Sequence, residues 1–191
     1  RGVQPDAGAT VVSIAAGVRI APLRRWLGSA AAIVRCMPNT PAQLRSGVTA
    51  LYAPPETGAA ARDLAEKILR SVGATCWVKD EALLDAVTAL SGSGPAYFFL
   101  LTEVLRDAGQ ALGLDTATAK LLAEKTFIGA GHMAEAGGKD VAELRANVTS
   151  RGGTTEAALA YLEKHGLRKL FADALKAAEQ RGRELGATFE Q

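Results

Sequence analysis

The character of the sequence changes once, near residue 79, and this change constrains the fold more than any other feature. Before it, short β-branched runs alternate with helical patterns, and after it only helical patterns occur. Strands that alternate with helices favour an α/β sheet, for which the parallel, doubly wound arrangement is the default. The sequence therefore predicts an α/β domain over residues 1–79, followed by an all-helical domain over residues 80–191.

The first part contains four runs that are expected to be strands. They lie at residues 10–14, 32–36, 47–52 and 75–78. Helical patterns occupy residues 20–27 and 56–72, and Gly73 follows the second of them in the usual position after a helix.

The second part is expected to consist of helices separated by glycines. The expected helices are 80–90, 96–112, a helix capped by Asp115 that runs to about Ala136, 140–148, 154–165 and 167–186, with a break at 91–95. The first turns of the 96–112 helix, Tyr97–Leu101, are apolar nearly all round. Such a helix must be covered on several sides, which indicates a central position or a subunit interface.

Charge and composition exclude several classes of partner. The chain has 22 Lys and Arg against 20 Asp and Glu and no long run of like charges, so neither nucleic acid nor an anionic membrane surface is the expected partner. No apolar stretch approaches the roughly 20 residues that span a bilayer. Cys36 and Cys76 each stand alone in apolar stretches, which favours buried thiols and a cytoplasmic location over a disulfide.

Conventional catalytic residues are scarce. The only two histidines, His132 and His165, have no neighbouring nucleophile or carboxylate in the sequence. The Asp and Glu residues occur on helix faces together with Lys and Arg, as solvated charges do. No metal site, phosphate-binding loop or nucleophile elbow is recognisable, so hydrolysis by a triad or a metal ion is not expected.

Two loops follow expected strands and are candidate ligand sites. One is Ala15-Ala16-Gly17, and the other is the rigid segment Cys36-Met37-Pro38-Asn39-Thr40-Pro41. In open α/β sheets, ligands bind at the carboxyl ends of strands. Each loop taken alone is equally well explained as a turn stiffened by Pro or Gly.

The third unusual stretch is Val148-Thr149-Ser150-Arg151-Gly152-Gly153-Thr154-Thr155, just before a helical run. Free backbone N–H groups and hydroxyls converge at such a helix start, which is how small-anion sites are built. The alternative is a capping loop without a ligand. A nucleotide against the sheet and a small anionic substrate held by the helical domain would account for all three stretches.

Three motifs carry a family resemblance. Met37–Pro41, Asp85–Tyr97 and Val148–Thr155 together resemble pyrroline-5-carboxylate reductase, the last enzyme of proline biosynthesis, and the likeness extends over essentially the whole chain. The resemblance implies the C-terminal part of a Rossmann-type NAD(P)-binding domain, followed by a helical dimerisation domain. It also implies hydride transfer from NADPH, or from NADH, to the C=N carbon of 1-pyrroline-5-carboxylate, and a homodimer able to assemble further.

The resemblance assigns roles to residues of the three stretches. Thr155 would be the catalytic residue that hydrogen-bonds the ring nitrogen, and backbone N–H groups around Gly153 would bind the substrate carboxylate. The implied substrate-binding residues are Val148, Ser150, Gly152, Gly153, Thr154 and Thr155. The implied cofactor-binding residues are Ala15, Ala16, Gly17, Met37, Pro38, Asn39 and Thr40, and no metal is implied.

The chain also departs from the family pattern. The family has a strand and a G-x-G-x-x-G-type turn for the dinucleotide pyrophosphate, and neither precedes the expected strand at Thr10. We therefore expect this chain by itself to bind the dinucleotide poorly or not at all. Arg151 stands where many relatives have Pro. Two alternatives stay open: another Rossmann-plus-helices dehydrogenase of the β-hydroxyacid type, and a non-catalytic dimerising scaffold.

Overall fold

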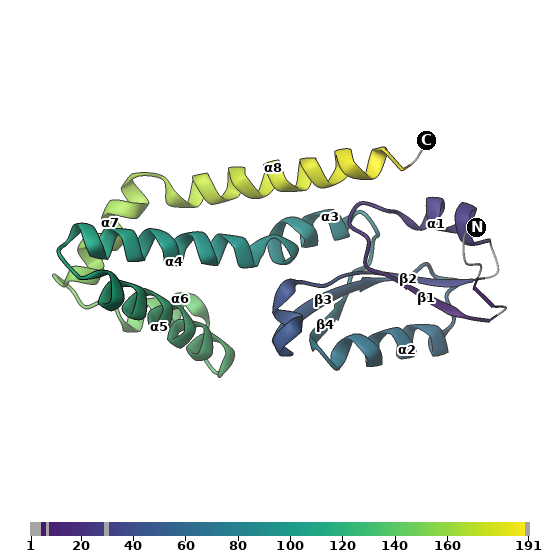
Figure 1. The fold of residues 1–191 in the computed structure, drawn as a ribbon, viewed down its shortest axis with the longest axis horizontal. Coiled ribbons are helices and arrows are strands. Elements are labelled where there is room, and N and C mark those ends of the chain that lie inside the picture. Colours follow the sequence, from purple (N-terminus) through teal and green to yellow (C-terminus); the bar gives the residue numbers. More distant parts are fainter. Residues whose placement is uncertain (1–4, 7, 29–30, 190–191) are drawn as a thin grey trace. The chain divides into compact units, whose positions relative to one another are not determined.

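The structure is a computed structural model that describes residues 5–6, 8–28 and 31–189 (Figure 1). Its strands are β1 (Thr10–Ser13), β2 (Ala32–Met37), β3 (Gly47–Tyr52) and β4 (Gly73–Trp77). Its helices are α1 (Ile20–Leu27), α2 (Ala59–Arg70), α3 (Leu83–Val87), α4 (Gly94–Ala111), α5 (Thr116–Glu135), α6 (Val141–Asn147), α7 (Thr154–Lys164) and α8 (Leu167–Ala187). A 3-10 helix, η1 (Thr40–Leu44), and a π-helix, η2 (Thr88–Gly92), complete the order. The predicted change from alternating elements to helices is confirmed.

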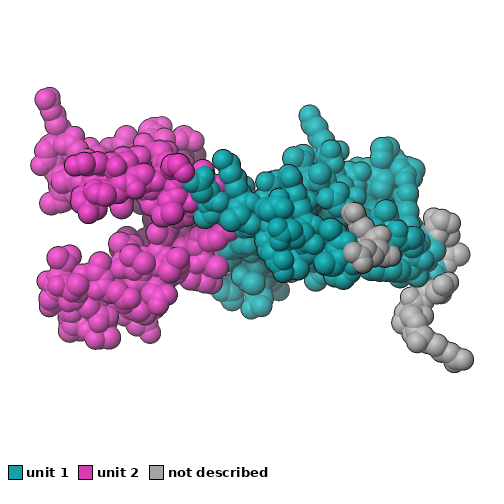
Figure 2. Space-filling view, turned by 90° about the horizontal axis from the view of Figure 1, so that it is seen from above, with its two compact units in different colours: residues 1–95, 173–191 teal, residues 96–172 magenta. Residues whose placement is uncertain are grey.

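The chain forms two compact units (Figure 2). Unit 1 contains residues 1–95 and 173–191, and unit 2 contains residues 96–172. Unit 1 holds the sheet with its helices and the end of α8, whereas unit 2 consists of helices and the loops that join them. The functional division at residue 79 stays a prediction.

The sheet of unit 1 is mixed, which corrects the expectation of a parallel sheet. Its strand order is β1-β2-β3-β4; β1 pairs with β2 and β3 with β4 in parallel, but β2 and β3 are antiparallel. The reason lies in the connections. A parallel crossover requires a dozen or more residues, and only residues 38–46 join β2 to β3. The chain must therefore return beside β2 in the opposite direction.

Strand β2 divides the core of unit 1 into two layers. Its side chains alternate between the faces of the sheet, so that Val34 and Cys36 pack in one hydrophobic cluster with Ala65 and Leu69 of α2. Ile33 packs on the opposite face in a second cluster with Ile20, Leu23 and Val18. Figure 1 shows α2 on one side of the sheet and α1 and α3 on the other. Helices on both faces are the doubly wound arrangement that the sequence predicted.

The two cysteines differ in environment. Cys36 is buried in β2, where burial raises the pKa of its thiol to about 11. Cys76 is exposed, so the prediction that both thiols are buried is wrong for this residue. It lies on β4, the last strand of the described sheet, between Thr75 and Trp77, whose side chains turn to Glu66 of α2. The alternation of the strand leaves Cys76 on the other face.

Unit 2 is built from helices with many exposed apolar side chains. The carboxylate of Asp115 accepts from the Thr118 N–H at 3.0 Å, which confirms the predicted cap of α5. Along α4 the exposed large apolar side chains are Phe98, Phe99, Leu100, Leu101, Val104 and Leu105. The nearly all-round apolar start of this helix is therefore only partly covered by the described residues of its own chain. Across the described residues no helix is both long and apolar enough to cross a membrane.

Candidate active site

The two predicted cofactor loops meet at one edge of the sheet. Because β1 and β2 run in parallel, with Ser13 opposite Arg35, their carboxyl ends lie side by side. Ala15-Ala16-Gly17 follows β1, and Met37 with the residues after it follows β2. Ala15 and Ala16 are exposed, whereas Gly17 and Met37 are buried. This edge has the position at which open α/β sheets bind ligands.

The loop after β2 is held rigidly. The side-chain oxygen of Asn39 accepts a hydrogen bond from the Val48 N–H at 2.9 Å, and this bond ties the loop to the start of β3. Pro41 stands in the first turn of η1, where its fixed φ fits a helix start. Asn39 therefore has a structural role in addition to any contact with a ligand.

The segment after α3 corrects the predicted break at 91–95. The chain does not open into a loop there; α3 continues as the π-helix η2, and α4 begins at Gly94. Gly92 faces Met37, since a Cβ built on this glycine would lie 3.4 Å from the Met37 sulfur. Single π turns occur often at functional sites, and the Ser-Gly-Ser-Gly run gave no sign of this geometry. The π turn brings Gly92 to the same sheet edge.

A partly buried charged cluster supports this edge, which corrects the view that the acidic side chains are solvated. Glu81 Oε1 accepts from Arg35 Nη1 at 3.1 Å and from the Ile20 N–H at the start of α1 at 2.8 Å. Asp85 is buried and pairs with Arg19 at 3.4 Å. Arg35 itself is only 1% exposed. Ion pairs of this kind stay fixed because a buried charge without its partner is costly.

The predicted substrate loop is found between α6 and α7 in unit 2. Gly152 has φ +74°, a conformation that favours glycine, and its N–H donates to Glu156 Oε2 at 2.7 Å. The Gly153 N–H donates to the Ser150 carbonyl at 3.0 Å. A Cβ on Gly153 would lie 2.7 Å from Ser150 Oγ and 3.0 Å from the Ser150 carbonyl oxygen, so a larger residue there would require Ser150 to shift. The loop is thus a tight turn that feeds directly into α7.

The start of α7 keeps hydrogen-bond donors available. No side chain of the described chain caps its first turn, and the first N–H groups of a helix have no acceptor within the helix. Thr154 and Thr155 are the first two residues of α7, and Ser150 lies across the turn from them. N–H groups and hydroxyls therefore converge here, with the positive end of the helix dipole behind them. The structure brings Ser150, Gly152, Gly153, Thr154 and Thr155 together, and exposed Val148 precedes them at the end of α6.

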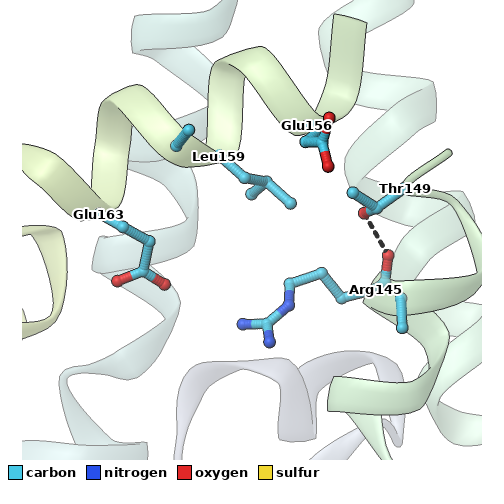
Figure 3. A pocket seen from close by; sticks show the side chains of 7 residues that line it. Arg145, Thr149, Glu156, Leu159 and Glu163 are labelled. Carbon is cyan, nitrogen blue, oxygen red and sulfur yellow. Dashed lines mark hydrogen bonds between the residues drawn. The ribbon is translucent and has the colours of Figure 1, made fainter. Parts of the chain in front are cut away.

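A cavity of about 400 Å³ adjoins this loop within unit 2. Figure 3 shows Arg145 extending from α6 into the space below α7, with Glu156, Leu159 and Glu163 along the opposite side. Thr149 closes the end near the loop, and its hydroxyl donates to the Arg145 carbonyl at 2.6 Å. None of the predicted substrate residues lines the cavity. Because Glu156 also binds the Gly152 N–H, the cavity and the loop share one wall.

Other candidate chemistry is sparse in the part of the chain that the structure describes. His165 stacks on Tyr161 with ring centroids 3.9 Å apart, and its Nδ1 lies 2.7 Å from the Tyr161 carbonyl oxygen. The described residues contain no group of three or more His, Cys, Asp or Glu that could hold a metal ion. The sheet edge of unit 1 and the start of α7 in unit 2 are therefore the two candidate sites.

The sheet is doubly wound, and loops suited to ligand binding follow its strands. The helical part that follows contains a helix start suited to anion binding. Together these features define a Rossmann-type α/β protein with a helical second part. Residues 81–185 match the family described as pyrroline-5-carboxylate reductase dimerisation. The chain belongs to the pyrroline-5-carboxylate reductase family.

Individual relatives support this assignment. A pyrroline-5-carboxylate reductase from Pseudomonas aeruginosa is 50% identical over 181 residues, which cover 95% of this chain and 66% of that protein. One from Pisum sativum is 41% identical over 179 residues, 92% of this chain and 63% of that protein. This chain therefore spans just under two thirds of the length of these relatives.

Solved structures agree in fold. A pyrroline-5-carboxylate reductase from Coxiella burnetii superposes with a TM-score of 0.88 at 48% identity, covering 92% of this chain and 65% of that chain. The Plasmodium falciparum pyrroline carboxylate reductase, solved with NADP bound, gives a TM-score of 0.82 at 32% identity, covering 92% and 69%. The predicted combination of a Rossmann-type part and a helical part is confirmed.

Proposed function

We propose that the complete protein is a pyrroline-5-carboxylate reductase, which reduces the C=N bond of 1-pyrroline-5-carboxylate to give L-proline. The observation that carries the proposal is the helix start at Thr154 and Thr155, with its uncapped first turn, in a chain 50% identical over 95% of its length to a reductase of this name. The family assignment favours this function over the β-hydroxyacid dehydrogenase alternative.

We assign NADPH, with NADH as the second choice, to the edge formed by Ala15–Gly17 and Met37–Thr40. The arrangement fits a dinucleotide because the two loops adjoin and because the small side chains of Ala15 and Ala16 are exposed there, leaving room for a flat ring. When bound, the cofactor supplies the hydride. Met37, Pro38, Asn39 and Thr40 would hold its ribose and nicotinamide from the rigid loop after β2.

The substrate is a cyclic imine that carries a carboxylate. The carboxylate fits the donors at the start of α7, namely the N–H groups of Thr154 and Thr155, since the Gly153 N–H is engaged with Ser150. Val148, Ser150, Gly152 and Gly153 would form the surrounding wall. The Thr155 hydroxyl would hydrogen-bond the ring nitrogen, which must carry a proton once hydride has been added to the C=N carbon. A protonated imine is already electrophilic, so a single hydrogen-bonding group suffices.

We also propose that the protein works as a homodimer in the cytoplasm, with a higher assembly of dimers compatible with the family. Support for the dimer comes from exposed apolar side chains such as Phe98 and Phe99 on α4, within the residues that match a dimerisation family. Large exposed apolar patches mark interaction surfaces. Support for the cytoplasm comes from Cys36 and Cys76, which are both free thiols.

The test is the reaction itself, carried out on the protein in its complete length. Oxidation of NADPH and of NADH is followed by absorbance with pyrroline-5-carboxylate, and product is identified as proline by chromatography. Stoichiometric formation of proline is expected. A β-hydroxyacid substrate serves as the control for the other dehydrogenase class. Absence of turnover together with an intact dimer would favour the scaffold alternative instead.

A further inference from the structure

The end of α8 lies directly against the Ala15–Gly17 loop within unit 1. A Cβ on Gly186 would be 2.8 Å from the carbonyl oxygen of Gly17, and one on Gly17 would be 3.0 Å from the Gly186 N. Both glycines are buried. The helix and the loop therefore touch backbone to backbone, with no side chain between them. A displacement of the helix end would therefore displace the loop through direct backbone contact.

The loop depends on this support because its own conformation is restrictive. Gly17 has φ +77°, in the left-handed region that other residues adopt at a cost. The residue before the loop segment, Ser13, is held by strand pairing. After the loop, Ile20 is held by the hydrogen bond that its N–H donates to Glu81. Between these anchors, Ala15 and Ala16 are exposed. Gly186 is the contact beneath the middle of the loop.

The end of α8 is itself held in place. The ring of Phe189 meets Trp26 of α1 edge to face, with centroids 6.4 Å apart. The Phe189 carbonyl accepts a hydrogen bond from Arg25 Nη2 at 3.3 Å. These contacts fix the helix end against α1, the helix that begins just after the loop.

We propose that Gly186 is a positioning residue for the dinucleotide and acts through Gly17. Because residue 186 has no side chain, the backbone of α8 can contact the Ala15–Gly17 loop and so determine the position of this loop at the cofactor edge. The inference rests on the proposed function for its ligand, but the contact itself is a property of the chain. Gly186 lies beyond the residues that match the dimerisation family, which end at 185.

The chain offers a matched control. Gly182 lies one turn earlier on the same helix and would meet no atom within 4 Å if it carried a Cβ. Gly182→Ala and Gly186→Ala both add one methyl group and both raise helix propensity. Only the methyl group added by Gly186→Ala would collide with the loop. The comparison therefore isolates the contact from any general effect on α8.

The experiment uses the complete protein and two measurements. NADPH affinity is measured by fluorescence titration, and hydrogen exchange of residues 14–18 is measured without cofactor. We expect Gly186→Ala to weaken NADPH binding about tenfold, which is less than the roughly 10²-fold loss in rate that a 1 Å misplacement in an active site can cause. Exchange of the loop should quicken, and the KM for pyrroline-5-carboxylate should change far less. Gly182→Ala should match the wild type in all three.

The outcomes separate the inference from the proposed function. Equal NADPH affinity in the wild type and Gly186→Ala would overturn the positioning role while leaving the function intact. A wild type that binds neither NADPH nor NADH would overturn the cofactor assignment and with it the positioning of a dinucleotide. If Gly186→Ala does not fold, Phe189→Ala loosens the same helix end from outside, and unchanged affinity in that variant would likewise count against the proposal.

Discussion

The guanidinium of Arg35 is buried in β2 and contacts Oε1 of Glu81 at 3.1 Å, while the same oxygen accepts the Ile20 N–H. One carboxylate oxygen thus joins a strand, the start of α1 and the segment that leads into α3. One terminal nitrogen of Arg35, Nη2, is buried without a partner among the described residues. Glu81 is the acceptor that compensates the charge of this arginine.

Removing Glu81 should therefore be strongly destabilising. Glu81→Ala leaves the Arg35 charge buried and unpaired, and we expect a loss of about 3 kcal/mol in the free energy of unfolding, measured from urea midpoints. Replacing both partners, as Arg35→Met with Glu81→Gln, should recover much of this loss. Glu143→Ala is the control, because the pair of Glu143 with Lys139 is exposed and should contribute little. A loss in Glu81→Ala no larger than in this control would contradict the structural role of the cluster.

Thr155 is the residue by which to test the proposed chemistry. Thr155→Val removes the hydroxyl while keeping the shape of the side chain, and we expect turnover to fall at least about tenfold, toward the 10²-fold range of lost proton-transfer assistance. Thr155→Ser keeps the hydroxyl and should retain most of the activity. Steady-state kinetics with pyrroline-5-carboxylate measures both variants. Wild-type turnover in Thr155→Val would remove this residue from the mechanism.

The apolar surface of α4 can be tested through the oligomeric state. Phe98 is 54% exposed, and its ring lies 5.7 Å from that of Phe127 on α5. Phe98→Glu places a charge on the proposed interface, and we expect monomers in light scattering because an unpaired charge is costly to bury. Gln110→Glu, which adds the same charge to a polar position of the helix, should leave the dimer intact. Dimers of unchanged stability in Phe98→Glu would show that this face is not the interface.

The last prediction concerns pH. The Trp77 indole N–H, which donates to Glu66 Oε2 at 2.8 Å, lowers the pKa of this carboxyl below its ordinary value, and donors from Arg70 and Thr75 add to the effect. Because the folded pKa is the lower one, the ionised carboxylate stabilises the fold above the unfolded pKa of about 4.3, and this stabilisation is lost as the pH falls through the folded pKa.

The stability difference between the wild type and Glu66→Gln should accordingly be largest near neutral pH and shrink as the pH falls through the lowered folded pKa of Glu66. Urea denaturation at several pH values, followed by tryptophan fluorescence, measures this difference. Glu124→Gln is the control, since the contact of its carboxylate with Lys120, at 3.9 Å, is exposed. A difference that stays constant with pH would argue against the coupling of Glu66 to Trp77.

The elements of the fold could be predicted because their patterns are local. Ile33 and Val34 point to opposite faces and are both buried, as expected for a strand covered by helices on both sides. The antiparallel return of β3 was also readable, from the shortness of residues 38–46, but the parallel default concealed it. The pairing of Glu81 and the burial of Asp85 were not readable, because they depend on Arg35 and Arg19, which lie far away in the sequence.

In the candidate site, too, local features could be predicted and long-range contacts could not. Glycines and hydroxyls before a helical run correctly predicted a turn at the start of α7, since helix starts use these residue types for local reasons. Which N–H groups of the turn are already engaged depends on the position of Glu156 and of the Ser150 carbonyl. That information exists only in the three-dimensional structure, as does the approach of Gly92 to Met37.

The division of unit 1 between residues 1–95 and 173–191 has a consequence for biosynthesis. A ribosome delivers the sheet before residues 96–172, and it delivers the helix end that supports Gly17 only after them. Domains generally fold as their segments emerge, but here the loop after β1 must wait for Gly186 before its final contact can form. The cofactor edge of the nascent chain is thus completed only after the helical surface proposed to recruit a second subunit has left the ribosome.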